Sequence, residues 1–471
     1  MTVGILAEEK IIMSKNAEVT ALQENEMGTL PVGKLLRKMA LPLIFSMFVQ
    51  VLYGLVDSMY VAQLGDSALT AISLCMPVQY LVLGVGIGIG VGVNSILSKK
   101  LGEKDEHGVN RAAGNGFVLV WIVSILFILM GLFAIEPFYR IQTDIPEVLD
   151  MSISYSRIIS IISFAALHEV LMERLLSATG KANLTMIPML TGAVTNIILD
   201  PIMIFGWFGC PALGIAGAAY ATVIAQAVAA LVALSLNLKF NKDVKFEAGG
   251  FVPNGCIIAE ILKVGIPVAL SQSLISVLAF GMNNILLSLS AVAPGIYVIY
   301  IRLQSFVIMP ASGMSTAGIS IIAYNYGAGN KERIMETLKK SIMVNLIVAV
   351  VGMIVFLAVP ELLLAMFNAS DAVLKIGVPA LRIIAASLLL TTTTQILTGF
   401  LQALGRGTDS FVIAITQAVF LLLAAWLLSL TGSAVLVWLA FPIMEVLRFI
   451  IGVFLVKRTY KNQIMKLEVA K

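Results

Sequence analysis

Two acidic residues stand inside long, mostly apolar stretches of this chain. Asp57 follows residues 39–56, and Asp200 follows residues 186–199. An ionisable side chain within a membrane segment is costly unless it faces water or a partner, so each acid is a functional candidate. Because a partly dry pocket favours a neutral acid over a carboxylate, such a group suits the binding and release of H⁺. The same carboxylates could exchange H⁺ for Na⁺.

The residues around Asp200 add further oxygen ligands. Asn196 precedes Asp200 by four positions, which puts both side chains on one face of a helix. Pro201 has no N–H, so it leaves a backbone carbonyl oxygen free one turn earlier. Amide, carboxylate and carbonyl oxygens are the ligands that hard cations prefer. Asp57, Asn196 and Asp200 are therefore a candidate metal site for Na⁺. The alternative is that each acid is structural and hydrogen-bonded to neighbouring helices.

Composition places these acids in a membrane protein. Hydrophobic residues make up 59% of the 471 positions and charged residues 12%, whereas roughly 25% of a soluble domain is charged. We therefore predict an all-α polytopic membrane protein. The glycine-rich run at 84–92 lies within a span and precedes no strand–helix unit, so it does not indicate a phosphate loop. With no Walker A sequence and no metal-ligand spacing of the cysteines, we expect neither an enzyme nor a cofactor.

Twelve stretches are long enough to span a membrane as helices, which takes roughly 20 apolar residues. They lie near residues 40–64, 71–97, 112–135, 154–177, 183–206, 213–238, 263–289, 295–325, 337–359, 376–402, 410–430 and 434–456. At about 1.5 Å per residue, Asp57 and Asp200 both lie roughly 25 Å along their helices, in the same half of the membrane. Lys and Arg gather in the loops on the side of both termini, which predicts cytoplasmic termini.

The chain repeats at an offset of 225 positions. The pairs that show it are Pro42 and Pro267, Ser46 and Ser271, Gln79 and Gln304, Gly102 and Gly327, and Arg157 and Arg382. Membrane transporters with such repeats hold their substrate sites between the halves. Because six helices per half is an even number, we expect two six-helix lobes related by a pseudo-twofold axis along the membrane normal, with a central cleft. The acids are not repeated, since Asp57 corresponds to Met282 and Asp200 to Ala425.

The expected domains follow from these spans. They are a cytoplasmic N-terminal tail (1–39), an N-lobe (40–240), a cytoplasmic linker (241–262), a C-lobe (263–457) and a cytoplasmic C-terminal tail (458–471). The first forty residues read as a polar tail and lack the pattern of a cleaved signal peptide.

Other charged residues lie within the spans. Glu169, deep in the fourth span, is a secondary candidate for proton relay. Arg302, in the eighth, is the other secondary candidate; it has no neighbouring partner in the sequence, and its role stays open. Glu445 and Arg448 are three positions apart, so we expect them to neutralise each other on one helix face.

Four segments match motifs of a known family. The first is the run 40–65, which matches at 40–42, 56–57 and 63–65. The others are the loop 101–105, residues 196–201 and residues 214–222. In this order they resemble the multidrug and toxic compound extrusion (MATE) transporters, closest to the DinF-like and MepA-like bacterial branch. The resemblance covers nearly the whole chain beyond the tail and implies a drug/cation antiporter with two lobes in a V. It implies that Asp57 and Asp200, assisted by Asn196, bind H⁺ or Na⁺.

The resemblance also assigns neighbouring residues. Tyr53 matches a pocket tyrosine and Thr222 a hydroxyl of the cation site, while Pro42 is either a bending point of the first helix or an ordinary N-terminal proline. The expected substrate pocket comprises Tyr53, Asp57, Met59 and Asp200, and the expected hinges are Pro42 and Pro201. In other branches acids lie in helices seven and ten. Those helices here offer Gln272, Asn283, Asn284 and Thr391–Thr394, so we do not expect coupling through the C-lobe.

These observations predict a multidrug antiporter of the bacterial cytoplasmic (inner) membrane. It would export amphipathic, mostly cationic compounds by alternating access, driven by inward H⁺ or Na⁺. We expect small-molecule drugs and the lipid bilayer as partners, no nucleic acid, and function as a monomer. Ionised acids would favour the drug-accepting state, and ion binding from outside would shift the first helix and expel the drug.

Two alternatives remain open from the sequence. The first is a flippase for lipid-linked saccharides, which should line its cleft with arginines for pyrophosphate; the available ones are Arg157, Arg302 and Arg382. The second is a membrane receptor that transports nothing and needs no unpaired acids within its spans. A flux assay with a substrate gradient separates them.

Overall fold

The structure, a computed structural model, describes residues 25–290, 292–367 and 370–467, and every regular element in these ranges is a helix. The N-terminal half contains α2 (Glu26–Thr29), α3 (Val32–Ala62), α4 (Asp66–Gly102), α5 (Glu106–Phe133), α6 (Ile135–Arg140), α7 (Pro146–Ile161), α8 (Ser163–Ala178), α9 (Met186–Phe205) and α10 (Ile215–Phe240). The C-terminal half contains α11 (Gly255–Leu287), α12 (Ala293–Gly327), α13 (Lys331–Ala358), α14 (Pro360–Ala365), α15 (Asp371–Ala385), α16 (Ser387–Ala403), α17 (Gly407–Ser429) and α18 (Ala440–Asn462).

The predicted plan of twelve spans is confirmed. Ten described helices are long and apolar enough to cross a membrane, and α15 with α16 forms an eleventh span that is bent by 49°. α7 and α8, which only Ile162 separates, occupy the place of the remaining predicted span at residues 154–177. The break at Ala386 lies within one residue of the repeat equivalent of Ile162. Both halves therefore interrupt their fourth span at the same depth.

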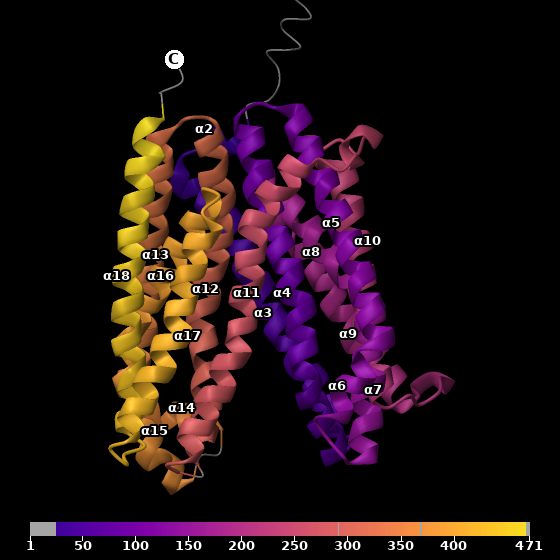
Figure 1. Cartoon of the computed structure of the whole chain (residues 1–471), viewed down its shortest axis with the longest axis vertical. Helices are drawn as coiled ribbons and strands as arrows, with labels where there is room; N and C mark the ends of the chain where they lie inside the picture. Colours follow the sequence, from indigo (N-terminus) through magenta and orange to yellow (C-terminus); the bar gives the residue numbers. More distant parts are fainter. Residues whose placement is uncertain (1–24, 291, 368–369, 468–471) are drawn as a thin grey trace, which may run out of the picture.

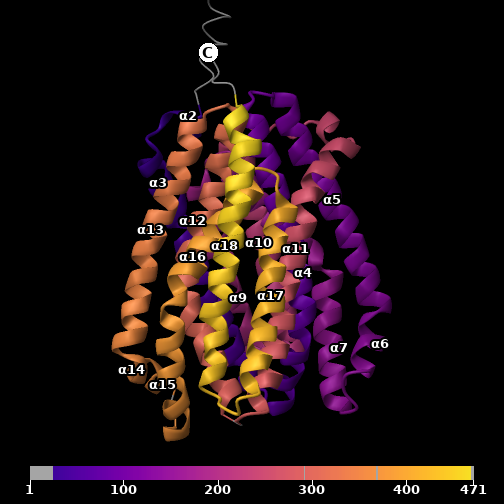
Figure 2. The ribbon, with the colours of Figure 1, turned by 60° about the vertical axis from the view of Figure 1, so that its left-hand side comes forward.

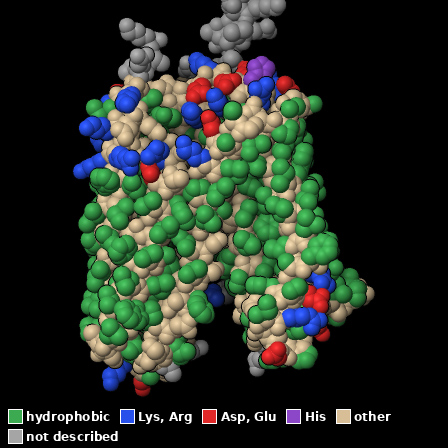
Figure 3. All heavy atoms as spheres, viewed as in Figure 1, with side chains coloured by type: hydrophobic (Ala, Val, Ile, Leu, Met, Phe, Trp, Pro, Cys, Tyr) green, Lys and Arg blue, Asp and Glu red, His purple; other side chains and the backbone are tan. Residues whose placement is uncertain are grey.

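The helices form two bundles that meet at the end near α2 and separate toward the other end (Figure 1). One bundle holds α4 to α10 and the other α11 to α18, in which α13, α16, α18 and α17 lie side by side (Figure 2). Charged side chains gather at the two ends of the molecule, and a broad apolar belt lies between them (Figure 3). The molecule is hollowed between the bundles at the end away from α2. The described part of the chain therefore has two lobes and a cleft.

Two glycines show the pseudo-twofold relation between the halves. Gly102, at the end of α4, lies so close to the carbonyl oxygen of Tyr324 on α12 that a Cβ would overlap it. Gly327, at the end of α12, lies in the same way against the carbonyl oxygen of Lys99 on α4. The four positions form two pairs at the offset of 225, 102 with 327 and 99 with 324. Each half thus makes the same contact with the other, as a twofold axis requires.

Buried hydroxyl groups join the halves about two turns from these glycines. Ser95 Oγ on α4 donates to the carbonyl oxygen of Gln402 on α16 (2.9 Å), and Ser320 Oγ on α12 donates to Asn94 Oδ1 on α4 (3.0 Å). Ser95 and Ser320 are again repeat equivalents. Each bond contributes about 1 kcal/mol only while the lobes touch here, so these contacts hold the end near α2 closed.

Replacing Gly102 or Gly327 with valine should open this end of the molecule. Overpacking costs about 1–3 kcal/mol, enough to shift the equilibrium between closed and open ends roughly tenfold. The reporter is Ala323→Cys, in a protein that lacks the native cysteines, because position 323 is buried in the closed state. The measurement is the rate at which a maleimide labels this cysteine. Gly295→Val is the control, because a Cβ there meets no atom within 4 Å. Equal labelling rates in all three variants would show that the glycine contact does not hold this end closed.

Two helices begin earlier than the sequence predicts. α3 begins at Val32 instead of residue 40, and α11 begins at Gly255 instead of residue 263. Basic residues in the first turns of α3 (Lys34, Arg37 and Lys38), and Glu260 and Lys263 near the start of α11, hid these helix starts from an apolar criterion. The tail predicted at 1–39 is packed structure from residue 25 onward, because Arg333 Nη2 donates to the carbonyl oxygens of Met27 (3.0 Å) and Leu30 (2.7 Å). Residues 1–24 lie outside the described ranges.

Candidate cation and substrate site

The packing of α3 on α9 brings the two predicted acids to one level. Both helices start at the end near α2, since Gly180, just before α9, lies against Met27. Near their other ends the rings of Tyr60 and Phe205 lie 6.3 Å apart. Asp57 lies three residues before Tyr60 on α3, and Asp200 lies five residues before Phe205 on α9, so the two acids are at about the same level. The carboxyl group of Asp57 is close enough to act electrostatically on that of Asp200.

Asn196 and Asp200 are almost completely buried, with exposed fractions of 1% and 0%. Asn196 Nδ2 donates to Asp200 Oδ1 (3.3 Å). The two side chains therefore lie on one face of the helix, as their spacing of four residues predicts. Three further oxygens, Asp57 Oδ1, Asn196 Oδ1 and Asp200 Oδ2, are buried and have no hydrogen-bond partner among the described residues. Leaving such atoms unsatisfied costs about 1–3 kcal/mol each. The site therefore has unused capacity for a proton or a small cation.

The donor set fits a hard monovalent cation better than a transition metal. Among the described residues no group of three His, Cys, Asp or Glu side chains could hold a metal ion. Two carboxylates and one amide oxygen remain, which is oxygen chemistry suited to Na⁺ or H⁺. Proline at 201 leaves the carbonyl oxygen of Ile197 without its helical donor, which adds a fourth possible oxygen on the same helix.

Small residues on α10 allow α9 to approach closely and cover the buried pair. Gly217, Ala221, Ala225 and Ala229 recur every four residues and are all buried. Gly217 lies against the backbone of Met203, and a Cβ at position 192 of α9 would lie 3.1 Å from Cβ of Ala229. Stripes of small residues are typical of closely packed membrane helices. This packing shields Asp200 from lipid.

Tyr53 and Glu169 join the same polar region. Tyr53 lies one turn before Asp57 on α3, in the neighbourhood of Asp200 and Glu169. Glu169 Oε1 on α8 lies 3.9 Å from the Cβ position of Gly192, one turn before Asn196 on α9. The structure therefore places Glu169 next to the acid pair, on the side toward α2.

The sequence did not point to Tyr155, which belongs to the same region. Tyr155 on α7 is buried, accepts a hydrogen bond from Gln79 Nε2 on α4, and is acted on by the charges of Asp57 and Asp200. A tyrosine has no charge, so the argument from the cost of buried ions did not find it. The sequence contains one indirect indication of Tyr155, its hydrogen-bond partner Gln79, which recurs in the second half as Gln304.

Three of the predicted residues lie apart from the acid pair. Met59 is 59% exposed and, two residues from Asp57, lies on the opposite side of α3 because successive residues are about 100° apart. Thr222 is half-buried next to Ala221, and no described hydrogen bond links it to Asn196 or Asp200. Arg302 lies on α12 in the other lobe and is exposed.

The two predicted hinge prolines lie inside their helices. α3 runs through Pro42 from Val32, so the interpretation of Pro42 as an ordinary N-terminal proline is wrong. A proline inside a helix removes one backbone hydrogen bond and favours a kink. Both helices that carry the acids therefore have a weakened point.

The C-terminal half has no equivalent acid site. Met282 and Ala425, which occupy the repeat positions of the two acids, are fully buried in an apolar cluster. A buried ion pair of this half is formed by Glu445 and Arg448 on α18, where Arg448 Nη1 donates to Glu445 Oε1 (3.2 Å). The two side chains neutralise each other as predicted.

The outer arginines are paired with glutamates that repeat at the same offset. Arg157 Nη2 lies 3.3 Å from Glu136 Oε2, and Arg382 Nη2 lies 3.2 Å from Glu361 Oε1. Hydrogen bonds from Arg140 and then from Arg157 hold the pKa of Glu136 below its usual range. A pyrophosphate site needs free arginines in the cleft, so these pairs argue against the flippase alternative.

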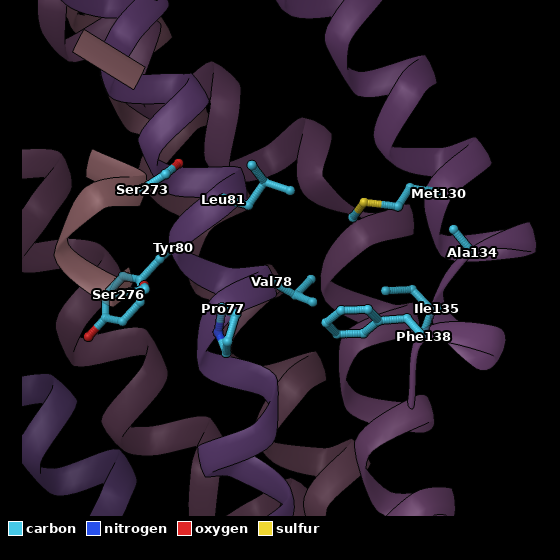
Figure 4. A pocket seen from close by; sticks show the side chains of 10 residues that line it. All are labelled: Pro77, Val78, Tyr80, Leu81, Met130, Ala134, Ile135, Phe138, Ser273 and Ser276. Atoms are coloured by element: carbon cyan, nitrogen blue, oxygen red, sulfur yellow. The ribbon is translucent and has the colours of Figure 1, made fainter. Parts of the chain in front are cut away.

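An apolar cavity of about 320 Å³ lies between α4, α5, α6 and α11, and neither acid of the pair lines it. It is lined by Pro77, Val78, Tyr80, Leu81, Met130, Ala134, Ile135, Phe138, Ser273 and Ser276. Figure 4 shows Val78 of α4 pointing toward Phe138 of α6, with the two serines of α11 on the opposite side of α4 in this view. It contains no charged residue, so it offers an amphipathic molecule contact area but no ion site.

Comparison with known proteins agrees with this arrangement. The family model MatE matches the chain twice, over residues 42–202 and 267–427, and the two matches are separated by the repeat offset. The multidrug export protein MepA of Staphylococcus saprophyticus is 28% identical over 401 residues, which are 85% of this chain and 88% of that protein. MepA of Staphylococcus aureus strain N315 is 28% identical over 410 residues, 87% of this chain and 90% of that protein.

A solved structure extends the comparison to the fold. It is described as the outward-facing conformation of a multidrug resistance MATE family transporter of the MOP superfamily. Its TM-score is 0.86 at 25% sequence identity, with 95% of this chain and 99% of that chain covered. The relatives are transporters and not enzymes.

Proposed function

The chain belongs to the MATE family, and from that premise we propose that it is a multidrug antiporter driven by H⁺ or Na⁺. The observation that carries the proposal is the group of three buried oxygens without partners on Asp57, Asn196 and Asp200. A coupling acid must be free to bind its ion, and these oxygens lie on two helices, α3 and α9, that pack against each other. The names of the staphylococcal relatives support multidrug export as the activity.

The charge distribution supports a bacterial cytoplasmic membrane orientation with the α2 end inside. Basic residues concentrate at this end (Figure 3), which is the pattern of cytoplasmic segments. The cleft then opens to the outside, and the contacts of Gly102 and Gly327 close the cytoplasmic side. The structure is accordingly the state that releases drug and accepts the driving ion.

The proposed cycle uses the acids as a shared binding site for ion and drug. In the inward-open state the ionised carboxylates attract a cationic drug. In the outward-open state H⁺ or Na⁺ from outside reaches Asp57 and Asp200, neutralises them and removes the attraction. Pro42 lets α3 move with this change, and Glu169 lies where it can pass a proton toward the cytoplasmic side. Drug and ion thus favour opposite states, which is the differential affinity that alternating access needs.

The proposal is tested by export of ethidium from proteoliposomes under a pH gradient or a Na⁺ gradient imposed separately. We expect export with at least one gradient and none without either. If a pH gradient alone drives export, H⁺ is the coupling ion; if only a Na⁺ gradient does, it is Na⁺. Absence of flux under both gradients, with intact and correctly inserted protein, would contradict the proposed function and favour a receptor that transports nothing.

A further inference from the structure

Arg302 lies on the side of α12 that packs along α3, near the end where the bundles separate. α12 runs antiparallel to α3, since Asn325 Nδ2 donates to the carbonyl oxygen of Met27 at the closed end (3.0 Å). Further along, a Cβ at Gly313 would lie 2.6 Å from Ile44 Cγ1, and the rings of Phe306 and Phe48 are 6.2 Å apart. Arg302 follows one turn beyond Phe306 on the same face, toward the end where the bundles separate.

The guanidinium group of Arg302 is free among the described residues, with no ion pair or hydrogen bond. It is exposed, whereas Tyr300, Leu303 and Val307 on the other side of α12 are buried in the core of their lobe. Arg157, Arg382 and Arg448 all have carboxylate partners. An unpaired arginine within a span faces water or a ligand.

The positive charge of Arg302 has no counterpart at the equivalent position of the other lobe. The repeat equivalent of Arg302 is Pro77, which lines the apolar cavity beside α4. The other charged groups that α3 and α9 bring to the cleft region are acids. The cleft is therefore acidic on the α3 side and basic on the α12 side.

We propose that Arg302 determines substrate specificity by binding a carboxylate of zwitterionic amphipathic substrates. The inference rests on the proposed function and extends it to one substrate class. A guanidinium group offers two parallel N–H donors that match a carboxylate. The cationic part of such a compound would lie toward Asp57 while its carboxylate binds Arg302. A purely cationic compound gains nothing from Arg302.

The test compares a rhodamine that has a free carboxylate with its methyl ester, which differs only in that charge. Binding of each dye to the purified protein in nanodiscs is measured by fluorescence polarisation for the unaltered chain, Arg302→Gln, Arg302→Lys and the control Arg382→Gln. Arg302→Gln should weaken binding of the carboxylate dye by roughly tenfold or more, the effect of losing a charged hydrogen bond, and leave the ester within about twofold. Arg302→Lys should restore part of the loss, and Arg382→Gln should change neither dye.

Several results would overturn the inference. Equal weakening of both dyes would show a structural role, and no change with either dye would show that Arg302 does not contact substrate. An effect seen only in nanodiscs with anionic lipid, and with both dyes, would assign the arginine to a lipid headgroup. If the unaltered protein binds and exports neither dye nor ethidium, the proposed function fails and this inference fails with it. Binding of the ester alone by the unaltered protein overturns only the role of Arg302.

Discussion

Asp200→Asn should abolish ion-driven export while the protein still folds and inserts. Asparagine keeps the size of the side chain and its bond to Asn196, but it cannot take up H⁺ or neutralise Na⁺. Asp200 is fully buried with one free oxygen, so no other group can replace it at that place. The measurement is ethidium export by proteoliposomes under the gradient that drives the unaltered protein.

We expect export by Asp200→Asn, and by Asp57→Asn, to fall to the level of liposomes without protein. Asp144→Asn is the matched control, because Asp144 is an exposed acid in a loop at the open end of the cleft. If both variants of the acid pair export at the full rate, the pair is structural and the coupling site lies elsewhere. Full activity of only one of them would assign coupling to the other acid alone.

Arg448→Met should destabilise the protein by about 3–5 kcal/mol, because it leaves Glu445 buried without its partner. Glu445 and Arg448 are 3% and 7% exposed, so water cannot compensate for the lost ion pair. Replacing both, with Glu445→Leu and Arg448→Met, should restore most of the stability, since an apolar pair has no charge to bury. Thermal unfolding in detergent, followed by intrinsic fluorescence, measures both changes.

This prediction separates structural charges from coupling charges. If Arg448→Met keeps its unfolding temperature but loses export, the ion pair of α18 takes part in transport. A double variant as unstable as the single one would mean that the pair contributes something other than mutual neutralisation. The expected pattern is loss of stability in the single variant and near-normal export in the double variant.

The sequence predicted the architecture and the acid pair because both depend on strong physical constraints. The hydrocarbon thickness sets the length of a span, and the offset of 225 sets the relation of the lobes, which the contacts of Gly102 and Gly327 show at atomic level. A buried acid is conspicuous in an apolar sequence, so Asp57 and Asp200 could be found without a structure. Their proximity rests on the register of α3 and α9, which only the packing of Tyr60 on Phe205 reveals.

Other features could not be predicted because their cost is small or their position depends on packing. Tyr155 is neutral and has one hydrogen-bonding group, so its burial has no sign in the sequence. The serines that join the lobes, Ser95 and Ser320, are common residues whose partners lie in other helices. Helix ends were misplaced at Val32 because basic residues at the membrane interface continue the helix beyond its apolar part. Methionine at 59 suits a pliable apolar wall, but which side of α3 it occupies depends on the turn of the helix, which separates it from Asp57.

The most direct test of the central claim is to measure ion release when drug binds to the purified protein. In weakly buffered detergent solution, addition of ethidium should release H⁺, or displace radioactive Na⁺ bound beforehand, in proportion to the drug bound. The release should disappear when Asp57→Asn and Asp200→Asn are combined, and it should persist in Asp144→Asn. Drug binding that releases neither ion, or a release that is unchanged in the combined variant, would contradict the account of a carboxylate site shared by ion and drug.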